Sequence, residues 1–201
     1  MDCFKLSQIK NLNGKKFRFF EVIEQVENHK VIKFDGDSKL LSVLRTAAKS
    51  IIEPVNNSKD KDSNFPKRAN EFGNYVERFF RERLQNFGYD CVKPKTIGGK
   101  TKEAGYPDCL LIFESKPYYL EVKTCEAGSL NSSFRSFFYS PSESSKIDRD
   151  AVHLLIGFKT IKNQMQLTGD ILIADLFNKE VTLKLEYNSN NKELYKTSDL
   201  L

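Results

Sequence analysis

The spacing of apolar residues changes at Gly88, and this change limits the possible folds more than any other feature of the chain. Residues before Gly88 form a stripe at helical spacing, which predicts a long helix. Pro66 suits the entrance of this helix and Gly88 its exit. Short apolar runs of strand character follow. The stripe consists of Phe72, Tyr75, Val76, Phe79, Phe80, Leu84 and Phe87.

The runs after Gly88 are rich in β-branched and aromatic residues, as strands are. They cover residues 89–92, 108–113, 118–122, 154–158, 171–174 and 181–185. Four residues separate the second run from the third, which predicts an antiparallel hairpin. A helix, a hairpin and further strands together predict an α/β (α+β) fold, with a mixed central β-sheet flanked by helices.

The first 64 residues are expected to form an N-terminal strand/helix extension. Residues 16–23 and 30–34 have the composition of strands, and residues 38–51 have a helical pattern that Pro54 should end. Residues 56–64 are polar and predict a loop or linker. We therefore expect an extension over residues 1–64 and a main unit over residues 65–201, together in one compact domain.

Composition excludes several classes of protein. Lys and Arg number 32 against 27 Asp and Glu, so the net charge of +5 leaves open an anionic partner met by a local basic surface. No apolar run approaches the roughly 18–20 residues that cross a bilayer, and no signal peptide is visible, so we expect a soluble, cytoplasmic protein. The four cysteines form no C-x-x-C pair and there are two histidines, which argues for reduced cysteines and against zinc.

Two carboxylates and a lysine come together in the predicted hairpin. Pro107-Asp108 begins its first strand, and Glu121-Val122-Lys123 lies in the second. Side chains alternate along a strand, so Glu121 and Lys123 share a face. Charged groups among buried apolar residues are costly unless something compensates them. A divalent cation between Asp108 and Glu121, with the Lys123 ammonium close by, would compensate them.

This set of groups suits hydrolysis of a phosphodiester. Mg²⁺ prefers oxygen ligands and takes part of its shell from water and substrate phosphate. It lowers the pKa of a bound water and neutralises charge that develops at the phosphorus. A nearby lysine orients or deprotonates the attacking water, or stabilises that charge. We therefore expect Mg²⁺ as the cofactor, with Mn²⁺ as a substitute.

Pro107-Asp108 followed by Glu121-Val122-Lys123 resembles the PD-(D/E)xK signature of restriction-endonuclease-like nucleases, and most of all type II restriction endonucleases. The resemblance covers roughly residues 71–158. It implies a restriction-endonuclease-like core, with a helix ahead of the hairpin that adds a glutamate one turn after a small residue. Gly73 and Glu77 match that position, and Glu71 is the competing residue. The implied catalytic set is Asp108, Glu121, Lys123 and Glu77, with the three carboxylates as metal ligands.

Stretches on either side of the motif carry candidate DNA contacts. Residues 93–102 contain four lysines, a Gly-Gly pair and no acid, which suits salt-sensitive phosphate contacts, although an ordinary solvated loop has the same composition. Residues 131–140 resemble a segment that approaches DNA in restriction enzymes, or else contribute core aromatics. Residues 144–150 predict a cap and a short helix. The predicted DNA-binding residues are Lys93, Lys95, Lys100, Lys102, Asn131, Ser133, Arg135, Lys146 and Arg149.

The sequence therefore predicts a Mg²⁺-dependent, sequence-specific endonuclease acting on double-stranded DNA. One such site cuts one strand, so a double-strand cut implies a homodimer. The resemblance also implies a cognate DNA methyltransferase in the same system. Two alternatives remain: a structure-selective repair or recombination nuclease such as a junction resolvase, and a catalytically silent DNA-binding module on the same fold.

Overall fold

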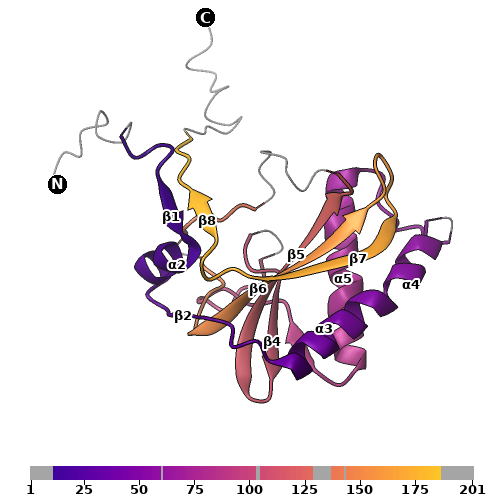
Figure 1. The fold of residues 1–201 in the computed structure, drawn as a ribbon, viewed down its shortest axis with the longest axis horizontal. Helices are drawn as coiled ribbons and strands as arrows, with labels where there is room; N and C mark the ends of the chain where they lie inside the picture. The colour runs from indigo at the N-terminus through magenta and orange to yellow at the C-terminus, as the bar shows by residue number, and fades with distance from the viewer. Residues whose placement is uncertain (1–10, 60, 103–104, 129–136, 143, 187–201) are drawn as a thin grey trace, which may run out of the picture.

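A mixed six-stranded sheet forms the centre of the protein in the computed structural model, which describes residues 11–59, 61–102, 105–128, 137–142 and 144–186 (Figure 1). Its strand order is β2-β6-β5-β4-β3, and β7 also pairs with β6. The strands are β2 (Val31–Ile32), β3 (Asp90–Val92), β4 (Cys109–Phe113), β5 (Lys116–Glu126), β6 (Ala151–Thr160) and β7 (Leu167–Asp175).

Helices cover one face of this sheet, and a smaller layer covers the other (Figure 1). The first layer contains α3 (Ser38–Ser50), α4 (Ile52–Asn57) and α5 (Ala69–Asn86). The second contains α2 (Phe19–Glu27) and a two-stranded antiparallel ribbon of β1 (Lys16–Arg18) and β8 (Glu180–Thr182). The buried apolar residues form two cores, the first between the sheet and the layer of α3, α4 and α5, and the second between the sheet and the layer that contains α2. Leu120 and Val122 of β5 pack in the first core, whereas Tyr119 packs in the second. This alternation confirms that β5 is buried on both faces.

The long helix and the hairpin form as their sequences predict. The apolar stripe lies in the first core, except for Phe87, which follows the last residue of α5 and is exposed. Gly88 comes next, with a φ of +85°, a conformation that glycine adopts without strain. β4 and β5 pair antiparallel, and β5 pairs parallel with β6, so the sheet is mixed. The predicted α+β class is confirmed.

The expectation of a strand over residues 16–23 is wrong after Arg18, where α2 begins. Tertiary contacts decide this, because Phe19 and Ile23 lie one turn apart and are both buried in the second core. The backbone N–H of Arg18 also donates to the Glu21 carboxylate at 2.6 Å, which stabilises the start of the helix. Strand propensity in an aromatic run is easily overridden by such packing.

Three further expectations need correction. Pro54 lies within the first turn of α4, a position that tolerates proline, and Asn56 belongs to that helix. The Asn56 amide exchanges two hydrogen bonds with the Leu167 backbone of β7. No helix forms over the described part of residues 144–150, because Ile147 is buried in the second core and Lys146 is buried beside it.

Within the described ranges, β2 belongs to the same sheet as the hairpin. Helix α3 packs in the first core together with α5 and the hairpin. Cys91, Cys109 and Cys125 are free thiols. None of the described helices is both long and apolar enough to span a membrane.

Candidate active site

Asp108 stands where the hairpin brings β4 against β5. The turn between the strands uses Glu114 and Ser115, both at positive φ, and sets Cys109 opposite Leu120. The Asp108 backbone N–H donates to the Leu120 carbonyl at 3.2 Å. The carboxylate oxygen Oδ2 of Asp108 accepts the Val122 N–H at 2.8 Å. Backbone pairing therefore holds this carboxylate next to residue 121.

Glu121 and Lys123 project from the same face of β5 and form an ion pair, with 2.5 Å between Oε1 and Nζ. The Glu121 side chain is 3% exposed and that of Lys123 is 32% exposed. Burial and the nearby charge of Asp108 raise the pKa of Glu121 to about 7. Burial alone would lower the pKa of Lys123, but the charges of Glu121 and Asp108 outweigh it and the pKa is raised. Lys123 is therefore an ammonium in this arrangement.

Helix α5 presents Glu77 to the same place. Gly73, one turn earlier, faces β5 so closely that a Cβ there would lie 3.6 Å from the Thr124 hydroxyl. This close approach carries Glu77 to Asp108, and Glu77 is buried. Burial and the Asp108 charge raise the pKa of Glu77, while its ion pair with Arg81 opposes the rise.

Glu71, the competing helix carboxylate, lines a pocket together with Glu77 but is more exposed. It pairs with Arg68 and keeps 40% of its side chain exposed. The charge of Asp108 raises the pKa of Glu77, so these two carboxylates lie close together. Of the two glutamates, Glu77 is therefore the one whose surroundings match those of Asp108 and Glu121.

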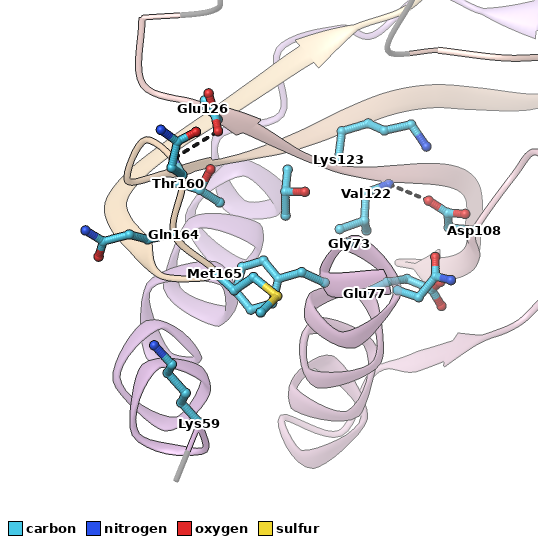
Figure 2. A pocket seen from close by; sticks show the side chains of 14 residues that line it. Lys59, Gly73, Glu77, Asp108, Val122, Lys123, Glu126, Thr160, Gln164 and Met165 are labelled. Atoms are coloured by element: carbon cyan, nitrogen blue, oxygen red, sulfur yellow. Dashed lines mark hydrogen bonds between the residues drawn. The ribbon is translucent and has the colours of Figure 1, made fainter. Parts of the chain in front are cut away.

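Two pockets meet over these groups, and they share Asn74, Glu77, Asp108 and Lys123. The larger, of about 880 Å³, extends from the hairpin past Gly73 to Lys59 and the β6–β7 turn, where it is lined by Gln164 and Met165 (Figure 2). The smaller, of about 640 Å³, adds Glu121 and a series of cationic side chains. These are Arg78, Arg81 and Lys93. An extended anionic substrate could lie across both.

Glu121 has a feature that fits a cation. Its oxygen Oε2 is buried and has no hydrogen-bond partner among the described residues, which is costly for a carboxylate. Within the described ranges, no three His, Cys, Asp or Glu side chains form a ready-made metal site. Mg²⁺ needs fewer, since it is commonly bound by one or two carboxylates with water and substrate phosphate. Asp108 and Glu121 thus fit such an ion as a pair.

Backbone contacts within the basic loop and to the segment ahead of β6 hold the loop in place. Lys95 and Thr101 form an antiparallel bridge, and the Ile97 N–H donates to the Ser145 carbonyl at 2.9 Å. Lys95, Lys100 and Lys102 are exposed, whereas Lys93 is half-buried and lines the smaller pocket.

The remaining predicted DNA contacts differ in their placement. Asn131, Ser133 and Arg135 lie outside the described residues. Arg149 is half-exposed and donates two hydrogen bonds to the Asp148 carboxylate. Lys146 lies inside the protein at 3% exposure, which differs from the surface position that a phosphate contact requires.

Sequence reasoning missed several residues that line the pockets. Arg78 and Arg81 follow the helix motif, and the i,i+4 spacing of Glu77 and Arg81 was a readable signal for an ion pair. Lys59 and Gln164 gave no such signal, because only folding brings the residues after α4 and the β6–β7 turn close to Asp108 and Lys123.

His153 occupies the core behind the site. It is fully buried and its Nδ1 lies 2.5 Å from the Tyr106 hydroxyl. Burial lowers its pKa to about 3, so the ring is neutral.

Comparison with known proteins is consistent with this geometry. Residues 12–198 match the model of the type II restriction enzyme MjaV family. The type II restriction enzyme MjaV of Methanocaldococcus jannaschii is 36% identical over 200 residues, covering 90% of this chain and 86% of that protein. No solved structure gives a significant match. The chain therefore belongs to the MjaV family of type II restriction enzymes.

Proposed function

We propose that this protein is a Mg²⁺-dependent endonuclease that hydrolyses phosphodiester bonds of double-stranded DNA at a specific sequence. Membership of a type II restriction enzyme family supports site-specific DNA cleavage. The observation that carries the metal-dependent chemistry is the buried, unpartnered Oε2 of Glu121, set beside Asp108 and Lys123.

Asp108 and Glu121 would hold the ion, and Glu77 would complete or tune its shell. Bound there, Mg²⁺ supplies a water of lowered pKa and positive charge for the phosphate oxygens. Glu77 is already engaged by Arg81, so we assign it the outer position. Mn²⁺, which accepts the same oxygen ligands, should substitute.

Lys123 acts as a cation in this proposal. Paired with Glu121, the Lys123 ammonium would orient the attacking water and stabilise charge on the phosphate. The water oxygen would form the new bond to phosphorus as the bond to the leaving oxygen breaks. The attacking water releases a proton to solvent, and the leaving oxygen takes up a proton from solvent. Arg78, Arg81 and Lys93 would contact the neighbouring phosphates from the smaller pocket.

A cut through both strands requires two such sites, because one site reaches one scissile phosphate. We infer a homodimer on the DNA, with one strand cut by each protomer. A restriction role further implies a cognate methyltransferase that protects the host sequence.

Cleavage of a long unmethylated duplex tests the proposal. Parallel reactions contain Mg²⁺, Mn²⁺, Ca²⁺ or EDTA, and the fragment ends are sequenced. Discrete fragments in Mg²⁺ and Mn²⁺ that share one end sequence are expected. Intact duplex in every metal would overturn the proposal, and cleavage confined to branched DNA would replace it with a junction nuclease.

A further inference from the structure

A short segment ahead of β6 ties together three parts of the candidate site. Its Ser145 carbonyl accepts a hydrogen bond from Ile97 in the basic loop. Its Lys146 ammonium reaches the residues that lead to Asp108. At the far end, Asp148 and the Tyr119 hydroxyl of β5 exchange two hydrogen bonds, of 2.7 and 3.0 Å.

Lys146 makes the most specific of these contacts. Its Nζ donates to the Gly105 carbonyl at 2.8 Å and to the Pro107 carbonyl at 3.3 Å. These two carbonyls bracket Tyr106, and the second belongs to the residue just before Asp108. Lys146 therefore holds the chain on the upstream side of Asp108, while β5 holds it on the downstream side.

The position of the ammonium also has an electrostatic consequence. Burial lowers the pKa of Lys146, but the charges of Asp108 and Glu77 oppose that fall, as does Glu121. A cation this close offsets part of the repulsion among the three carboxylates. A buried lysine without such partners would be costly, so its presence here calls for a role at the site.

We propose that Lys146 is a positioning residue, which fixes Asp108 for catalysis from inside the protein and does not contact DNA. The inference rests on the proposed function and adds to it a residue on the side of the site away from the substrate. It predicts that Lys146 affects the rate of the chemical step. Displacement of a catalytic group by about 1 Å can cost about 10²-fold in rate.

Lys146→Met tests the proposal, because methionine keeps much of the apolar stem and removes the charge and the donors. The contrast variant is Lys100→Met, an exposed lysine of the basic loop. Both are compared with wild type on a DNA fragment that the wild type cuts. The measurements are the dissociation constant at several salt concentrations in Ca²⁺, and the single-turnover rate in Mg²⁺ with enzyme in saturating excess.

Lys146→Met is expected to lower the single-turnover rate about 10²-fold, with the dissociation constant and its salt slope unchanged. Lys100→Met is expected to weaken binding and to reduce the salt slope. Lys146→Arg, which keeps charge and donors, should be faster than Lys146→Met. A wild-type rate for Lys146→Met, or a reduced salt slope in that variant, would overturn the proposal.

Thermal unfolding separates a role in the site from a role in the fold. We expect Lys146→Met and Lys146→Arg to unfold cooperatively. If both lack a cooperative transition, Lys146 is a residue of the fold and the proposal fails. If wild type itself cuts no DNA in any metal, the proposed function fails, whereas normal cutting by Lys146→Met refutes only this inference.

Discussion

Asp108 accepts the backbone N–H of Val122 through its carboxylate oxygen Oδ2 at 2.8 Å, so a side chain ahead of one strand is fixed by the middle residue of the Glu-x-Lys motif in the next. This hydrogen bond holds the Asp108 carboxylate beside the Glu-x-Lys motif. Residues 121 and 123 flank the donor, and their side chains share one face of β5. The backbone of the hairpin, more than the side chains themselves, sets the geometry of the site.

Asp108→Asn should leave the fold intact and lower the cleavage rate in Mg²⁺ by about 10²-fold or more. An amide oxygen can still accept the Val122 N–H, but it lacks the charge that binds a metal. A bound metal lowers the activation free energy by several kcal/mol. Single-turnover cleavage and thermal unfolding measure the two effects. Asp90→Asn, at an exposed position of β3, is the matched control. Equal rates for Asp108→Asn and wild type would remove Asp108 from the ligand set.

Glu121→Gln should change how stability depends on pH. The pKa of Glu121 is about 7 in the folded protein against an ordinary value of 4.5. Because the folded-state pKa is the higher, the stabilising contribution of Glu121 is full below about pH 4.5 and is lost as pH rises through about 7.

The comparison is made without metal by urea unfolding between pH 4 and 8. Glu121→Gln should gain stability relative to wild type as the pH rises through that window, because the glutamine is never charged. His153 titrates in both proteins and cancels in the difference. If the difference in stability between the two proteins stays constant with pH, the pKa of Glu121 is not raised in the folded protein.

Gly73→Ala and Gly73→Leu should separate helix stability from access to the pocket. A Cβ at residue 73 would lie 3.6 Å from the Thr124 hydroxyl, an ordinary contact. Alanine should therefore fit and stabilise α5 by about 0.5–1 kcal/mol, the usual gain over glycine inside a helix. Leucine should push α5 from β5 and slow cleavage. Thermal unfolding and cleavage rates test both, and normal cleavage by Gly73→Leu would contradict the close approach.

Tyr119→Phe should destabilise the protein by about 1–3 kcal/mol, because the Asp148 N–H loses its acceptor in a half-buried setting. The Asp148 carboxylate also loses the hydrogen bond that the Tyr119 hydroxyl donates. Tyr89→Phe is the matched control, since the Tyr89 hydroxyl has no hydrogen bond among the described residues. Denaturant unfolding measures both variants. Equal losses of stability would show that the Tyr119–Asp148 contact contributes nothing.

Periodicity predicted the parts of the fold whose local pattern and tertiary packing agree. The stripe of α5 and the short hairpin turn determine which elements form, and strand alternation puts Glu121 and Lys123 together. The failures lie where long-range contacts override propensity. Phe19 starts a helix because it packs against Tyr106 and His153, residues about ninety or more positions away.

The surroundings of the site were harder to predict for the same reason. A lysine in a polar run is typical of a surface, so nothing in the sequence placed Lys146 inside the protein. Its burial depends on the Gly105 and Pro107 carbonyls, whose position only the folded hairpin determines. Residues of the β6–β7 turn join the larger pocket through sheet pairing that a linear pattern does not show.

The cleavage rate of Lys123→Ala in Mg²⁺ tests the central claim most directly. Wild type, Lys123→Ala and Lys159→Ala are compared in single turnover on a fragment that the wild type cuts. Lys159 lies on neighbouring β6 and pairs with Asp170, away from the carboxylates. The proposed role of Lys123 predicts that its variant still binds the fragment but no longer cuts it, while Lys159→Ala cuts normally. Wild-type cutting by Lys123→Ala would contradict the assignment of the active site to this hairpin.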